Sequence, residues 1–135
     1  MNKRLVAGPP CGGKTTFVKV RALPHESVLD FDDIVERLTG DRYAEQAPKV
    51  LAEARRQWKA ALPAADWVVW TAPRRVDRGR FRSQFNAQVY VVMAPLGVCL
   101  ERAKRERPPP WEDLIRRWFA DWEPSRSGQE TIVNG

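Results

Sequence analysis

Residues 8–16, GPPCGGKTT, constrain the fold of this chain more than any other stretch. They match the pattern G-x-x-x-x-G-K-T of a phosphate-binding loop, the Walker A motif, which connects a strand to a helix. Both neighbours are present, because residues 4–7 predict a short strand and residues 15–20 begin a helical pattern. Glycines let backbone N–H groups converge on phosphate oxygens, and the positive end of the helix strengthens that field. The sequence therefore predicts a nucleoside triphosphate site.

The residue types of this loop suggest separate tasks. Lys14 is a candidate catalytic residue, because its mobile cation can reach the outer phosphates. The Thr15 hydroxyl is a hard oxygen ligand of the kind that Mg²⁺ prefers. We therefore expect ATP, or another nucleoside triphosphate, and Mg²⁺ as cofactors; a glycine turn that binds nothing is the disfavoured alternative. The residues expected to contact the nucleotide are Gly8, Pro9, Pro10, Cys11, Gly12, Gly13, Lys14, Thr15 and Thr16.

Strand and helix patterns alternate along the chain. Strands are expected at residues 4–7, 27–30, 66–71 and 88–93, with an edge strand at 130–133. Helices are expected from the loop to residue 21 and at residues 33–38, 43–62, 76–85, 95–106 and 111–122. This order predicts a three-layer α/β fold, with a parallel sheet of four to five strands flanked by helices. Ligands of such sheets bind beyond the carboxyl ends of the strands.

Composition favours one globular domain over residues 1–135, since 43% of the residues are hydrophobic and 30% are charged. No apolar run approaches the roughly eighteen residues of a membrane span, and no signal peptide opens the chain. Cys11 and Cys99 have the spacing of neither a metal site nor a disulfide framework. With nucleotide binding, this indicates a cytoplasmic protein without a membrane partner. The oligomeric state is left open.

Charge adds a hypothesis about the partner. The net charge is +6 and the pI is about 9.8. A basic surface attracts phosphates, and so nucleic acid. The alternative is a set of solvated faces around a nucleotide site. Charge by itself does not decide between the two.

Two carboxylates follow the second predicted strand, in VLDFDDIVERLTG. In extended backbone, Asp30 and Asp32 lie on the same side. Asp30 is the candidate for the Mg²⁺ shell, and Asp32 is the candidate base that accepts a proton from an attacking hydroxyl and contacts the substrate. The alternative is that Asp32 only caps the following helix.

These residues resemble the small P-loop kinases related to adenylate kinase. Shikimate kinase has a similar D-x-D before a charged helix that ends R-T-G. The kinase domain of phage-type polynucleotide 5′-hydroxyl kinase has an aspartate pair in the same place, and its base aspartate would fall on Asp32. The resemblance implies the P-loop kinase fold and transfer of the γ-phosphate of ATP to an alcohol.

The chain also departs from both families. Val35 stands where the polynucleotide kinases carry an arginine, and their carboxylate at the end of the third strand is absent here. Asp30 could take over that carboxylate's Mg²⁺ role, as the D-x-D of shikimate kinase suggests. The glycine-rich substrate loop of shikimate kinase is missing.

Two arginine groups follow the third and fourth strands. Arg74, Arg75 and Arg78 belong to a cluster that ends at Arg82 and could bind an anionic substrate; the alternative is a solvated helix face. The second group lies in LERAKRERPPPW, where the resemblance implies a lid around residues 103–112. By the resemblance, Arg102 would lie against the adenine. Arg105 and Arg107 would neutralise charge on the transferred phosphate and are catalytic candidates; a charged helix end is the alternative.

These features predict an ATP- and Mg²⁺-dependent phosphotransferase acting on a hydroxyl. We expect the hydroxyl to belong to nucleic acid, either at a 5′-end or on a modified base. The first alternative is a small-molecule or nucleoside kinase. The second is a nucleotide-binding NTPase without kinase activity.

Overall fold

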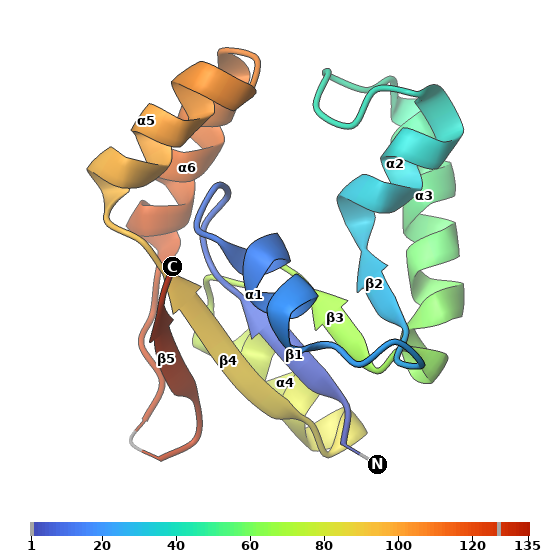
Figure 1. The fold of residues 1–135 in the computed structure, drawn as a ribbon, viewed down its shortest axis with the longest axis vertical. Coiled ribbons are helices and arrows are strands. Elements are labelled where there is room, and N and C mark those ends of the chain that lie inside the picture. The colour runs from blue at the N-terminus through green and yellow to red at the C-terminus, as the bar shows by residue number, and fades with distance from the viewer. Residues whose placement is uncertain (1, 127) are drawn as a thin grey trace.

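The computed structural model describes residues 2–126 and 128–135 and contains a parallel sheet between helices (Figure 1). The strands are β1 (Arg4–Ala7), β2 (Val28–Asp30), β3 (Trp67–Val69), β4 (Gln88–Met93) and β5 (Thr131–Asn134). The helices are α1 (Lys14–Arg21), α2 (Phe31–Thr39), α3 (Pro48–Ala61), α4 (Arg75–Phe85), α5 (Leu96–Glu106) and α6 (Pro110–Asp121), with a 3₁₀ turn η1 (Leu62–Ala64) after α3.

The sheet has the order β2-β3-β1-β4-β5, and every pairing is parallel. β1 lies at the centre, with Leu5 opposite Val68 of β3 and Val89 of β4. A central strand covered on both faces should be continuously apolar, and residues 5–7 of β1 are completely buried. The predicted α/β fold with a parallel sheet of up to five strands is confirmed.

Alternate side chains of β1 enter two separate cores. Leu5 and Ala7 pack with residues of α2, α3 and α4. Val6 packs on the other face, against Phe17 and Val18 of α1. Figure 1 accordingly shows α1 in front of the sheet and α4 behind it. A third, smaller apolar cluster joins α5 to α6 and reaches the phosphate-binding loop.

Two helix starts differ from the sequence prediction by two residues or more. α2 begins at Phe31, two residues early, because the Asp30 carboxylate caps it by accepting from the Asp32 amide at 2.9 Å. α3 begins at Pro48, five residues late, because proline is favoured in a first helical turn and disfavours helical backbone just before it. Residues 41–47 form a loop instead. Its first turn is fixed by the Asp41 carboxylate, which accepts from the amides of Tyr43 and Ala44 at 3.1 Å each.

None of the helices described in residues 2–126 and 128–135 is both long enough and apolar enough to cross a membrane.

Candidate functional site

The phosphate-binding loop connects β1 to α1 and lies tightly against β4. Gly8 has φ 150°, and a Cβ at this position would lie 2.2 Å from the carbonyl oxygen of Val92. A Cβ on Gly12 would lie 2.8 Å from the carbonyl oxygen of Pro9. Both contacts are too short for any side chain, so the fold requires glycine there. The loop is therefore packed into the sheet in the setting that the Walker A pattern predicts.

Lys14, the first residue of α1, folds back over this loop. Its Nζ donates to the carbonyl oxygens of Gly8 at 2.8 Å and Pro9 at 2.7 Å. Burial lowers the pKa of Lys14 to about 8, against the opposing effect of Asp30 and Asp32. Phosphate oxygens arriving at the loop would offer this ammonium a far better partner than neutral carbonyls do.

Asp30 ends β2 and is only 6% exposed. One of its oxygens caps α2, and the other accepts from Arg42 Nη2 at 3.2 Å. Burial and the neighbouring Asp33 raise its pKa, while the cap and Arg42 oppose that change. The helix-capping explanation proposed for Asp32 thus belongs to Asp30.

Asp32 lies half-buried in the first turn of α2. Burial, and then the negative charge of Asp30, raise the pKa of Asp32 to about 6. Arg42, Lys14 and Arg107 act in the opposite direction. A carboxyl with a pKa near the working pH, close to a phosphate-binding lysine, suits general base catalysis.

Thr15 and Asp30 fit a Mg²⁺ ion whose other ligands are water molecules and phosphate oxygens. Residues 2–126 and 128–135 contain no group of three or more His, Cys, Asp or Glu side chains placed to hold a metal. Mg²⁺ in phosphoryl-transfer sites keeps several waters and binds through few protein oxygens plus substrate phosphates. Thr15, exposed at the start of α1, can supply such an oxygen from its hydroxyl group. Because both Asp30 oxygens already accept hydrogen bonds, we expect Asp30 to act through water.

The three arginines predicted near the lid lie in different environments. Arg102 is half-buried and donates from Nη1 to the carbonyl oxygen of Cys11 at 3.0 Å, which supports the phosphate-binding loop directly. Arg105 is exposed on the last turn of α5. The side chain of Arg107 is only 14% exposed, and its guanidinium lies over the ring of Tyr43, 3.5 Å from the centroid.

The structure corrects the expectation for Arg78, which cannot contact a substrate because it is completely buried. Its Nε donates to the Glu130 carboxylate at 2.7 Å, and Nη1 donates to the carbonyl oxygens of Ala72 and Pro73. Nη2 donates to the carbonyl oxygen of Glu123. Arg78 is therefore a structural residue that joins α4 to the chain segments before and after it.

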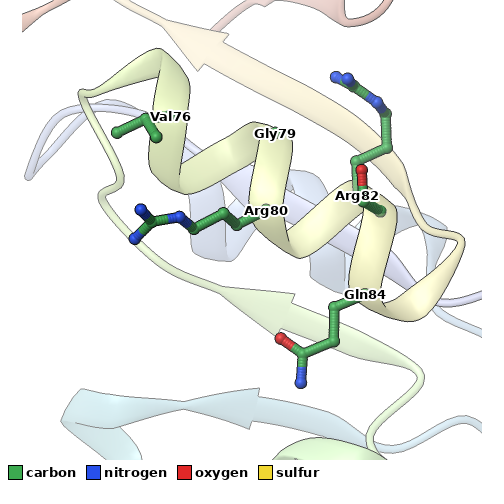
Figure 2. Close-up of a pocket in the computed structure, with 6 residues that line it drawn as sticks. Val76, Gly79, Arg80, Arg82 and Gln84 are labelled. Carbon is green, nitrogen blue, oxygen red and sulfur yellow. The ribbon is translucent and has the colours of Figure 1, made fainter.

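The rest of the α4 arginines do not form one surface. Arg74 and Arg75 are exposed at the start of the helix. Figure 2 shows Arg80 and Arg82 leaving α4 in different directions, around an open hollow that Val76 also lines. The buried Arg78 leaves a smaller exposed basic cluster on α4 than the sequence predicts.

Arg42 and Tyr43 were not expected at the site. Arg42 pairs with Asp30, with Asp33 and, at 3.7 Å, with Glu36. The sequence prediction placed Tyr43 at the start of a long helix, where no role for either residue was apparent. The signals that could have found them are Gly40, which ends α2 with φ 79°, and Pro48, which starts α3.

Comparison with known proteins shows which solved structures share this fold. No family model matches the chain, and no curated protein matches its sequence. The structure matches a gluconokinase from Sinorhizobium meliloti 1021 with TM-score 0.66 and 16% identity, covering 98% of this chain and 82% of that one. It matches a sugar kinase from Janibacter sp. HTCC2649 with TM-score 0.60 and 16% identity, covering 100% and 85%.

A shikimate kinase from Acinetobacter baumannii, in complex with shikimate, also matches, with TM-score 0.57 and 18% identity, covering 96% of this chain and 86% of that one. At such identities the likeness establishes the fold and leaves the substrate open. The resemblance to polynucleotide kinase stays a prediction. The chain has the fold of the small P-loop kinases.

Proposed function

We propose that this protein transfers the γ-phosphate of ATP, or another nucleoside triphosphate, to a hydroxyl group in a Mg²⁺-dependent reaction. The observation that carries the proposal is Asp32, whose pKa is raised to about 6 beside Lys14 of the phosphate-binding loop. A protein that binds the nucleotide but neither transfers nor hydrolyses its phosphate has no use for such a base. A kinase does, because the acceptor hydroxyl must lose a proton.

Each residue of the site then has a task. Asp32 orients the acceptor hydroxyl and takes its proton. Lys14 leaves the loop carbonyls and binds outer phosphate oxygens, and Thr15 supplies a hydroxyl ligand to the metal. Mg²⁺ held there would supply positive charge that offsets the charge of the phosphates. Residues 103–112 act as a lid within a single domain, from which Arg107 reaches the transferred phosphate.

For the acceptor, we favour a small molecule bearing a hydroxyl group. The buried Arg78 and the divergent Arg80 and Arg82 remove most of the basic cluster expected to hold a polyanion. The matched structures are described as gluconokinase, sugar kinase and shikimate kinase. A nucleic-acid hydroxyl is the second candidate. It is favoured by the net charge of +6 and by the exposed Arg74 and Arg75. With ATP as cosubstrate and two free cysteines, we place the protein in the cytoplasm.

A transfer screen with γ-labelled ATP tests the proposal. Sugars, sugar acids, cyclic alcohols and nucleosides are compared with single-stranded and duplex DNA and RNA. We expect label on a small molecule, a loss of about 10²–10⁴-fold in Asp32→Asn, and near-normal transfer in Asp113→Asn, an exposed aspartate of α6. Label on oligonucleotides only would establish the second candidate. Hydrolysis that no acceptor stimulates would identify an NTPase and overturn the proposal.

A further inference from the structure

Tyr43 is held by the lid through both its main chain and its ring. Trp111 Nε1, at the start of α6, donates to the carbonyl oxygen of Tyr43 at 2.8 Å. The two rings meet edge to face, with centroids 5.6 Å apart at 87°. The Arg107 guanidinium lies between lid and loop, 3.5 Å from the Tyr43 centroid and 5.4 Å from that of Trp111. An arginine stacked this way keeps its N–H groups free at the ring edge.

The loop that carries Tyr43 belongs to the other side of the site. It follows α2, which carries Asp32, whereas Arg107 and Trp111 belong to the α5–α6 pair. Figure 1 shows the turn between α5 and α6 facing the loop between α2 and α3, with the phosphate-binding loop below them. The Tyr43 contacts therefore connect the two walls of the candidate site.

Arg42 anchors this loop to the acidic residues of the site. Its guanidinium, only 15% exposed, pairs with Asp30, Asp33 and Glu36. Because Arg42 and Tyr43 are adjacent in the chain, the position of the Tyr43 ring is tied to the carboxylates beside the candidate base. The ion pairs of Arg42 therefore connect α2 to the loop whose Tyr43 ring contacts Arg107.

Arg107 itself has an unused donor. Its Nε is buried and has no hydrogen-bond partner in the part of the chain that the structure describes. Its Nη1 contacts Glu106, donating to the carbonyl oxygen at 3.4 Å and lying 3.5 Å from the carboxylate, which is itself 59% exposed. Arg107 also lies close enough to influence both Asp32 and Cys11 of the phosphate-binding loop. A buried guanidinium N–H without a partner, within electrostatic range of both groups, is suited to an incoming anion.

We propose that Tyr43 is a positioning residue: its ring and carbonyl hold the lid so that Arg107 points at the terminal phosphate of the bound nucleotide. This proposal rests on the proposed function, since the reaction gives Arg107 its phosphate. It adds that the orientation of Arg107, between α5 and α6, depends on Tyr43, in the loop after α2. The sequence of the lid alone does not reveal this dependence.

A double-variant cycle on Tyr43 and Arg107 tests this dependence. Two readouts are used: kcat and KM of transfer, and the affinity for a non-hydrolysable ATP analogue relative to ADP. We expect Tyr43→Ala to lower kcat, and the preference for the analogue over ADP, about tenfold each, the loss of one hydrogen bond to a charged group. Tyr43→Phe, which keeps the ring and the carbonyl, should restore both. In an Arg107→Ala background, Tyr43→Ala should add almost nothing.

The matched control is Arg116→Ala, an exposed α6 arginine whose loss should change neither readout. Thermal melts of every variant separate misfolding from misalignment. Additive losses in the cycle, or a folded Tyr43→Ala that keeps the analogue preference, would overturn the positioning role. The binding readout needs no acceptor, so these outcomes are distinct from a failure of the proposed function, in which nucleotide binds but no hydroxyl is phosphorylated.

Discussion

Arg78 and Arg107 are both withdrawn from solvent and both stacked on aromatic rings, yet their donors are used differently. Arg78 lies 4.6 Å from the Trp122 centroid and donates from all three nitrogens, to Glu130 and to backbone carbonyls. Arg107 lies over Tyr43, and within residues 2–126 and 128–135 its Nε has no partner. Both belong to arginine-rich stretches that look equally basic in the sequence.

This difference separates a residue that holds the fold from one placed for a ligand. Hydrogen bonds from all three nitrogens offset the free-energy cost of burying Arg78. Only one oxygen of its partner Glu130 has no hydrogen-bond partner among the described residues. Near Arg107, the cost of burying charge is not offset in this way. Burial raises the pKa of Asp32 and lowers that of Lys14. Charges held in such unfavourable states gather at functional sites, because the ligand relieves them.

The largest expected effect comes from removing Arg78. Arg78→Ala leaves the Glu130 carboxylate buried without its cation, so we expect the free energy of unfolding to fall by about 3–5 kcal/mol. Urea denaturation measures this. Arg80→Ala, an exposed neighbour on α4, should change it by less than about 0.5 kcal/mol.

The Arg78→Ala variant can also contradict the structural role assigned to Arg78. If Arg78→Ala unfolds at the urea concentration of the wild type but loses activity toward an anionic acceptor, Arg78 is the substrate arginine that its sequence context predicts. The double variant Arg78→Ala/Glu130→Gln should recover part of the lost stability, because it removes the unpaired charge.

Arg107→Ala should show the opposite pattern. We expect little change in stability and a fall in kcat of about hundredfold, the cost of one electrostatic contact to a developing charge. Arg107→Lys should recover only a minor part, since a lysine lacks the planar group that stacks on Tyr43. A drop in the unfolding midpoint as large as that of Arg78→Ala, with kcat preserved, would make Arg107 a second structural arginine.

The contrast between these arginines marks the limit of the sequence prediction. The phosphate-binding loop, the five strands and the order of elements follow from local patterns, because glycine spacing and apolar periodicity act over a few residues. Arg78 could not be interpreted in this way, since its partner Glu130 lies 52 positions along the chain. The helical pattern of residues 43–62 placed Tyr43 in a helix, whereas Pro48 sets the actual start. A contact across the fold determines the first outcome, and a local proline determines the second.

Asp32→Asn should stabilise the protein while it abolishes transfer. The folded-state pKa of about 6 lies above the ordinary value of 3.8, so the folded protein holds this proton more tightly than the unfolded chain does. Ionisation therefore costs stability, fully above about pH 7, only slightly at about pH 4 and not at all below about pH 3. Replacement by Asn removes a cost of about 1–2 kcal/mol at neutral pH, after allowance for partial solvent screening.

Urea melts at pH 7.5 and pH 4 measure this gain, with Asp113→Asn as the exposed control. The wild-type rate should also fall on the acid side with an apparent pKa near 6, because only the ionised carboxyl accepts the proton. An equal stability change at both pH values would mean that Asp32 carries no burial cost, and the case for it as the base would fail.

The smallest expected effect is the uptake of less than one proton by Lys14 when the nucleotide binds. Without nucleotide its pKa is about 8, so at pH 9 most of the molecules carry a neutral amine. Binding of a triphosphate restores the charge, and binding at pH 9 should then take up about 0.9 proton per site. At this pH neither ATP nor Asp32 titrates, and burial raises the pKa of the Cys11 thiol.

Calorimetry in two buffers with different ionisation enthalpies counts this proton directly. The uptake should disappear in Lys14→Met, and in the wild type the ATP affinity should fall by severalfold from pH 7.5 to pH 9, since part of the binding energy is spent on protonation. Lys19→Met offers a matched control, because it removes an exposed lysine from the same helix and should leave the proton uptake unchanged. Proton uptake that persists in Lys14→Met would mean that another group takes up the proton. Lys14 would then not be the destabilised charge of the site, and the contrast with the fully hydrogen-bonded Arg78 would fail.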